Sequence, residues 1–137
     1  MKEIIIVTGA SSGLGREFVR QIELKVNVDE IWVIARREER LKELKGEVKT
    51  PLKIFVLDLS KQESFDVIKN ALEKEKPLIK LLVNCAGFGK FGHSEKIPLE
   101  SQLNMIDLNC KAVVSASAVA LPFMSEGSKI INVASCA

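Results

Sequence analysis

The segment Thr8–Gly15, rich in small residues, most constrains how this chain can fold. It directly follows the apolar run Ile4–Val7, and its glycines Gly9, Gly13 and Gly15 have the spacing G-x-x-x-G-x-G. A strand that turns through glycines into a helix leaves free backbone N–H groups beside the positive end of the helix dipole. The pattern therefore predicts an anion site that fits a pyrophosphate, with a plain glycine-rich turn as the alternative interpretation.

Length and composition indicate one domain. A chain of 137 residues that is 47% hydrophobic can bury one core but not two. A net charge of +2 gives no sign of a nucleic-acid partner or an anionic membrane surface. The chain has three cysteines, and their spacing matches no metal-binding motif. We therefore expect reduced thiols, a cytoplasmic protein and no metal site. Ser115, Ser117 and Pro122 interrupt the longest apolar stretch, so we expect no membrane span, which needs about 18 apolar residues.

Strand and helix patterns alternate along the chain. Short apolar runs predict strands at Glu3–Val7, Glu30–Ala35, Leu52–Leu57, Leu78–Val83 and Lys129–Val133. The intervening segments predict helices over Leu14–Leu24, Glu38–Lys45, a segment from the Ser60 cap to Glu75, and Glu100–Leu121. Strict alternation with short connections favours right-handed crossovers and a doubly wound parallel sheet in an α/β domain over residues 1–137.

Two local signals predict helix ends. Gly46 is expected to terminate the second helix, because glycine readily adopts the left-handed conformation that closes a helix. Ser60 is expected to cap the third helix, with Glu63 completing a capping box.

Polar or glycine residues follow each predicted strand. Ligands of open parallel sheets bind at the carboxyl ends of the strands, beside the point where the strand order reverses. One rim of the sheet is therefore the predicted functional site, and its residues are Thr8–Gly15, Arg36, Asp58, Asn84–Gly87 and Ser135.

These motifs, in this order, resemble the N-terminal part of a short-chain dehydrogenase/reductase. The resemblance rests on T-G-x-x-x-G-x-G at Thr8–Gly15, Asp58-Leu59, N-x-A-G at Asn84–Gly87, Asn109 in the long helix, and I-N-x-x-S at Ile131–Ser135. It covers the whole chain and implies a Rossmann-type fold. It also implies an NAD(P)-dependent oxidoreductase that moves a hydride between a nicotinamide cofactor and a carbonyl or alcohol substrate. Cys85 stands where most members have a second Asn, and we interpret it as a small buried thiol.

The resemblance implies a role for each matching residue. It assigns the pyrophosphate and adenosine ribose to the glycine turn, at Gly9, Ser11, Ser12, Gly13, Leu14 and Gly15. It assigns the adenine amino group to Asp58, with Leu59 backing the ring. It assigns the wall of the cofactor site after the fourth strand to Asn84, Ala86 and Gly87.

The end of the second strand favours NADP(H) over NAD(H). An NAD-binding enzyme usually has a carboxylate there for the ribose 2′-hydroxyl, whereas this chain has Ala35 followed by Arg36 and Arg37. A guanidinium suits a 2′-phosphate. The alternative is that both arginines belong to the solvated start of the next helix. Ser12 points the other way, because many NADP-using relatives have a basic residue at that position.

The catalytic set that the resemblance implies is only partly present. Ser135 matches the family's Ser, and Asn109 matches its Asn. The Tyr-x-x-x-Lys pair is expected a little beyond Ser135, and the chain contains no tyrosine. We therefore expect a cofactor-binding part, truncated after about five strands and incomplete at its C-terminus, that is inactive alone. The alternative is a non-catalytic nucleotide-binding or association module that keeps the fold.

Two apolar segments predict a homo-oligomer. In the resembled family, the helix matching Glu100–Leu121 contributes to a dimer interface. The strand Lys129–Val133 would present an unpaired edge, and exposed edges pair with other chains. We expect association through the helix, the edge, or both.

Overall fold

The computed structural model describes residues 1–11, 13–87 and 92–133. Ser12 and Ser135, which the sequence assigns to cofactor binding and catalysis, lie outside the described residues. Parallel strands form one sheet in the order β3-β2-β1-β4-β5. The strands are β1 (Glu3–Thr8), β2 (Glu30–Ala35), β3 (Leu52–Val56), β4 (Leu78–Asn84) and β5 (Lys129–Asn132). The predicted α/β doubly wound fold is confirmed.

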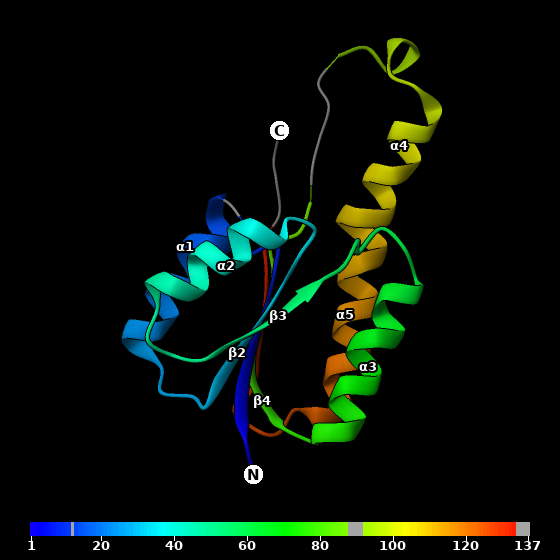
Figure 1. Cartoon of the computed structure of the whole chain (residues 1–137). Helices are drawn as coiled ribbons and strands as arrows, with labels where there is room; N and C mark the ends of the chain where they lie inside the picture. The colour runs from blue at the N-terminus through cyan, green and yellow to red at the C-terminus, as the bar shows by residue number, and fades with distance from the viewer. Residues whose placement is uncertain (12, 88–91, 134–137) are drawn as a thin grey trace.

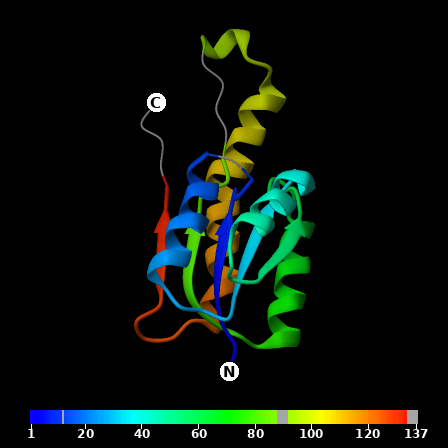
Figure 2. The same cartoon turned by 60° about the vertical axis from the view of Figure 1, so that its left-hand side comes forward.

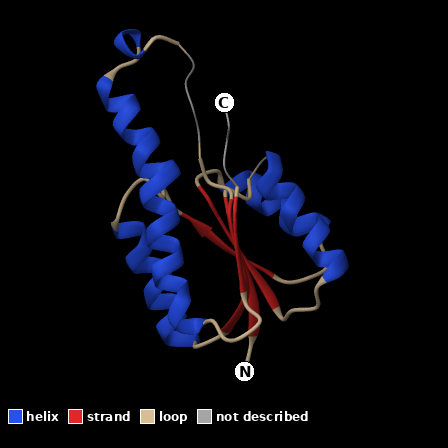
Figure 3. Cartoon of the chain, turned by 180° about the vertical axis from the view of Figure 1, so that it is seen from behind, coloured by secondary structure: helices blue, strands red, loops and turns tan. Residues whose placement is uncertain are grey.

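Helices cover both faces of the sheet, so the sheet is the middle of three layers (Figures 1 and 3). One face is covered by α1 (Gly13–Lys25) and α2 (Glu38–Glu47), and the other by α3 (Glu63–Glu75) and α5 (Ala112–Ala120). Successive side chains of β1 alternate between the two layers: Ile4 packs toward α3 and α5, and Ile5 toward α1 and α2. This is why the central strands are apolar on both faces.

The order of the strands reverses beside β1. The chain runs from β1 outward to β2 and β3, and it returns to place β4 on the other side of β1 and β5 beyond it. The carboxyl ends of β1 and β4 therefore flank the switch point, where doubly wound sheets bind their ligands. Figure 2 shows β5, in red, at the edge of the sheet.

Both predicted helix-end signals are wrong. Helix α2 continues through Gly46 to Glu47, and the Val48 N–H donates to the Leu44 carbonyl at its end. Helix α3 begins at Glu63 without a side-chain cap. The Ser60 hydroxyl instead donates to the Asp58 carboxylate at 2.7 Å, because that acceptor lies two residues away.

The predicted long helix is present over Leu99–Phe123, and it contains a wider turn that the sequence did not predict. After the short 3-10 turn η1 (Ser94–Lys96), the chain forms α4 (Leu99–Ile106), the π-helical turn η2 (Asp107–Lys111) and α5, which ends in the 3-10 turn η3 (Leu121–Phe123). Helix α5 buries a stripe of alanines against α3 and β4. Helix α4 buries no residue and extends beyond the sheet (Figure 1).

The segment Leu99–Phe123 is long and apolar enough to cross a membrane, judged by length and composition alone. In this fold, Ala112, Ala116 and Ala120 pack into the core beneath the sheet. The apolar residues of this segment are therefore buried in the described domain along α5, whereas no residue of α4 is fully buried.

Candidate functional site

The glycine turn lies where β1 meets α1, and its conformation depends on glycine. Gly9 has φ of +67° and Gly13 has φ of +58°, a left-handed region that other residues rarely adopt. A Cβ on Gly9 would lie 2.7 Å from the Ala86 nitrogen, and a Cβ on Gly15 would lie 2.7 Å from the Gly9 carbonyl carbon. The turn is therefore packed against itself and against the turn that follows β4.

Gly13 differs from the other two glycines of the motif. Among the described residues outside its chain neighbours and its own helix, a Cβ on Gly13 would meet no atom within 4 Å, so the space beside Gly13 at the start of α1 is open there. Helix α1 has no acidic residue in its first turn. The positive end of its dipole therefore faces the open space without a neighbouring carboxylate.

A groove of about 340 Å³ runs along the carboxyl ends of β1, β2, β3 and β4. It brings together most of the predicted cofactor residues: Gly9, Ser11, Gly13, Leu14, Gly15, Arg36, Asp58, Leu59, Ala86 and Gly87. Leu108 and Val133 also line it, and the sequence analysis assigned neither of them a role in the site. Residues that follow all five strands thus converge on one groove, as the parallel topology requires.

Asp58 is held in the ionised form. Its carboxylate accepts the Ser60 hydroxyl at 2.7 Å and the Ser60 backbone N–H at 3.0 Å. These bonds, with the nearby charges of Arg36 and Lys61, keep the pKa of Asp58 below its ordinary value although partial burial opposes the shift. The groove therefore contains a carboxylate acceptor suited to an amino group.

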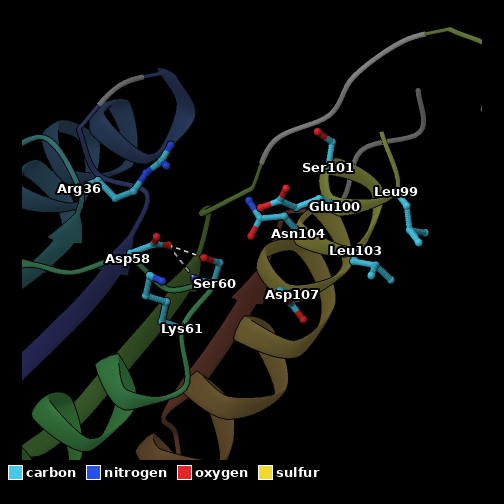
Figure 4. A pocket seen from close by; sticks show the side chains of 10 residues that line it. All are labelled: Arg36, Asp58, Ser60, Lys61, Leu99, Glu100, Ser101, Leu103, Asn104 and Asp107. Atoms are coloured by element: carbon cyan, nitrogen blue, oxygen red, sulfur yellow. Dashed lines mark hydrogen bonds between the residues drawn. The ribbon is translucent and has the colours of Figure 1, made fainter. Parts of the chain in front are cut away.

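A second cavity, of about 800 Å³, adjoins the groove and shares Arg36 and Asp58 with it. Figure 4 shows Arg36, Asp58, Ser60 and Lys61 on one side of this cavity, facing α4 on the other. Helix α4 lines it with Leu99, Glu100, Ser101, Leu103 and Asn104, and η2 adds Asp107. Arg36 therefore lies where the two cavities meet.

Thr8, the first residue of the glycine motif, is a structural residue of the site to which the sequence analysis assigned no individual role. It is buried, and its Oγ1 accepts the backbone N–H groups of Cys85 at 3.1 Å and of Ala86 at 3.2 Å. The position of Thr8, between the first strand and Gly9, was the sequence signal that could have indicated this role. Thr8 attaches the turn after β4 to the end of β1.

Asn84 and Cys85 lie at the end of β4 with different surroundings. Asn84 is buried, and its Nδ2 donates to Asn132 Oδ1 at 2.8 Å, so the side chain ties β4 to β5. Asn84 is not among the residues that line the groove, unlike Cys85. Burial raises the pKa of the Cys85 thiol, which keeps it protonated.

Among the described residues, no cluster of three or more His, Cys, Asp or Glu could hold a metal ion.

Asn109 lies in the π-helical turn, next to the turn after β4. A Cβ on Gly87 would lie 2.5 Å from Asn109 Oδ1, so the two residues are in close contact. The structure thus brings Asn109 to the wall of the groove formed by Gly87 and Leu108.

Comparisons with known proteins agree with this geometry. The family model for short chain dehydrogenases matches residues 3–137. Sulfoacetaldehyde reductase 2 of Chromohalobacter salexigens is 32% identical over 146 residues, covering all of this chain and 56% of that protein. The NADP-dependent 3-hydroxy acid dehydrogenase YdfG of Escherichia coli K12 is 34% identical over 141 residues, covering 98% of this chain and 54% of that protein.

Solved structures give the same result. Serine dehydrogenase from Escherichia coli superposes with a TM-score of 0.83 at 33% identity, covering 96% of this chain and 62% of that one. A closed form of serine dehydrogenase complexed with NADP+ gives a TM-score of 0.84 at 33% identity, covering 97% and 54%. The chain spans about half the length of the curated relatives it matches. With its family-specific motifs gathered on one rim, this chain belongs to the short chain dehydrogenase family.

Proposed function

We propose that this chain is the cofactor-binding part of an NAD(P)-dependent oxidoreductase, which moves a hydride between a nicotinamide dinucleotide and a carbonyl or alcohol substrate. The observation that carries the proposal is the groove, in which the open α1 N-terminus at Gly13 and the Asp58 carboxylate lie on the same rim. A pyrophosphate suits the first and an adenine amino group suits the second.

The residues of the groove fit the parts of a dinucleotide. The space that a Gly13 side chain would fill is available to a phosphate beside the first N–H groups of α1. Asp58 would accept the adenine amino group, and Leu59 would back the ring. Bound there, the nicotinamide would supply or accept the hydride. Asn109 and Ser135 would hold polar groups of the reaction, and Ser135 lies outside the described residues.

The 137-residue chain contains no tyrosine, the residue that exchanges the substrate proton in the resembled family. General acid–base catalysis contributes about 10²–10⁴-fold to a rate. We therefore expect the purified chain to bind a dinucleotide and to show no turnover of aldehydes, ketones or quinones with NADPH. The assay follows NADPH absorbance, and turnover near a typical enzyme rate of about 10 s⁻¹ would contradict the proposal.

The proposal includes a preference for NADP(H) over NAD(H). Arg36 is exposed at the end of β2 and lines the groove, as Arg37 does. The E. coli relative named as NADP-dependent and the serine dehydrogenase complexed with NADP+ support the preference. A guanidinium beside the adenosine ribose would form charge-assisted hydrogen bonds with a 2′-phosphate, each contributing about 1.5–3 kcal/mol.

Calorimetric titration tests the preference. The Arg36→Ala variant is expected to bind NADPH about 10- to 150-fold more weakly, with little change for NADH. Arg40→Ala is the matched control, because Arg40 is an exposed arginine of α2 that lines neither cavity. An unchanged ratio of the two affinities in Arg36→Ala would show that Arg36 does not read the 2′-phosphate.

A non-catalytic nucleotide-binding or association module is the second candidate. The exposed apolar residues of α4 favour it. Cofactor binding without turnover fits either candidate for this chain. The two are distinguished by the DNA downstream of codon 137: a reading frame that continues into Tyr-x-x-x-Lys and yields an active enzyme supports the oxidoreductase.

A further inference from the structure

The cavity of about 800 Å³ beside the groove has walls of opposite charge. Arg36 and Lys61 lie on the wall formed by the ends of β2 and β3, and Glu100 and Asp107 lie on the wall formed by α4 and η2. Figure 4 shows the Glu100 side chain extending from α4 toward the side on which Arg36 and Lys61 lie. The cavity therefore separates two cations from two carboxylates.

Three of these four charges have no ion-pair partner among the described residues. Asp107 pairs with Lys111 of its own helical turn, at 3.1 Å. Arg36, Lys61 and Glu100 are exposed, and none of them forms an ion pair within residues 1–11, 13–87 and 92–133. Their charges therefore act on whatever occupies the space between the two walls.

The cavity joins the groove at Arg36 and Asp58, which line both. The pKa of the Asp58 carboxyl is lowered first by its hydrogen bonds to Ser60, and then by the charges of Arg36 and Lys61. The two cations thus act on the same point of the rim. A phosphate held by Arg36 would lie at the mouth of the cavity, within the field of Lys61 and of Glu100.

We propose that Lys61 and Glu100 are specificity-determining residues, which set the preference between NADP(H) and NAD(H) in opposite directions. Lys61 attracts the 2′-phosphate that Arg36 holds, and Glu100 repels it. A phosphate monoester carries a charge of about −1.5 to −2 at pH 7, whereas the 2′-hydroxyl of NAD(H) is neutral, so only NADP(H) responds. Neither residue lines the groove itself, and the inference rests on the proposed function.

The test is a calorimetric titration of NADPH and NADH into the 137-residue chain at an ionic strength of about 0.02 M. Lys61→Gln is expected to lower the affinity for NADPH relative to NADH about threefold to fivefold. Glu100→Gln is expected to raise the same ratio about threefold to fivefold. These changes are those of one charge about 8 Å from a phosphate dianion in water at low salt.

Two sets of variants separate charge from shape and from position. Lys61→Arg and Glu100→Asp keep the charge, so the wild-type ratio is expected in both. Lys45→Gln and Glu126→Gln make the same changes of charge at exposed residues that line neither cavity. In both of these controls the ratio is expected to stay within about 1.5-fold of the wild type.

Salt gives a readout that a purely structural role would not move. At an ionic strength of about 0.5 M the screening length is about 4 Å, so the effects of Lys61→Gln and Glu100→Gln are both expected to fall below about 1.5-fold. Effects that persist undiminished at this salt concentration would overturn the proposal, because they would arise from altered packing and not from the field of the two charges.

Every outcome at low salt decides the proposal. Ratios that do not change, or that change in the same direction in Lys61→Gln and Glu100→Gln, overturn it. A change in only one of the two variants overturns the role of the other residue. If the wild type binds both dinucleotides and the variants have no effect, this proposal alone fails. If the wild type binds neither, the proposed function fails, and this proposal fails with it.

Discussion

Gly9 and Gly13 both adopt left-handed backbone, but only Gly9 also lies against another segment. A Cβ on Gly9 would meet the backbone of Cys85 and Ala86 at 2.7 Å, whereas a Cβ on Gly13 would meet nothing within 4 Å. A substitution at Gly9 therefore combines conformational strain with a steric clash. A substitution at Gly13 causes only the strain.

Gly9→Ala is expected to destabilise the chain more than Gly13→Ala. Left-handed backbone costs a non-glycine residue about 1–2 kcal/mol, and overpacking adds about 1–3 kcal/mol at Gly9. The free energy of unfolding, measured in urea, checks the difference between the two variants. Equal losses of unfolding free energy in the two variants would contradict this expectation, because the turn would then move away from Cys85 and Ala86 without a loss of stability.

The lowered pKa of Asp58 predicts a pH dependence of stability. The hydrogen bonds from Ser60 favour the ionised carboxylate in the folded state. A lowered folded-state pKa adds stability above the unfolded value of about 3.9, and this stability is lost as the pH falls through the folded pKa. The difference in unfolding free energy between the wild type and Asp58→Asn is therefore expected to shrink below about pH 4. A difference that stays constant from about pH 7 to pH 3 would contradict this account.

At the scale of elements, Thr8 links two strands through a side chain rather than through the sheet ladder. Its single hydroxyl oxygen accepts two N–H groups of the turn after β4. That turn contains Ala86 and Gly87, which line the groove. The hydroxyl therefore positions one wall of the site from the end of the central strand.

Thr8→Val keeps the shape of the side chain and removes the acceptor. Two partly buried N–H groups lose their partner, so the variant is expected to be about 1–3 kcal/mol less stable to urea unfolding. Thr8→Ser retains the hydroxyl and is expected to stay within about 1 kcal/mol of the wild type. A serine variant as unstable as the valine variant would assign the role to the methyl group.

The end of α2 also depends on another element. Arg16 and Arg20 of α1 form ion pairs with Glu47, at 2.9 Å and 2.6 Å. These pairs hold the last residue of α2 against α1, and they lower the pKa of the exposed Glu47 carboxyl. This partner accounts for a helix that continues past Gly46.

At the scale of the whole molecule, α4 and β5 each present exposed apolar side chains. On α4, the exposed fractions of the residues Leu99, Leu103 and Ile106 are 68%, 52% and 50%. Ile130 and Ile131 of β5 are also exposed, on the edge of the sheet. Contiguous apolar surface of this kind marks interaction sites.

Association of the chain therefore stays a prediction. At micromolar concentration, sedimentation velocity is expected to show a dimer or larger assembly, since burial of about 800 Å² per partner suffices for a stable contact. Leu103→Glu tests the helix and Ile131→Lys tests the strand edge. Val67→Glu is the control, because Val67 is an exposed apolar residue of α3, 46% exposed and outside both surfaces. A folded monomer of the wild type would contradict the prediction.

The residue order by itself determined the strands, the parallel fold class and the rim that carries the site. These features depend on local patterns: apolar runs of strand length, glycines at the end of Glu3–Thr8, and alternation with helices. Once the strands are parallel, their carboxyl ends share an edge. Arg36, Asp58 and Gly87 could therefore be placed together from the sequence, and they line one groove.

Only the tertiary structure decided how that rim is held together. The partner of Asn84 is Asn132, 48 residues away, and the partner of the Thr8 hydroxyl lies 77 residues away. Ser60 bonds to Asp58 instead of capping α3, and the π turn places Asn109 beside Gly87. Each of these outcomes depends on the distance between groups that the fold brings together. Local propensity and spacing contain no information on such distances, because the same short segment adopts different bonds with different neighbours.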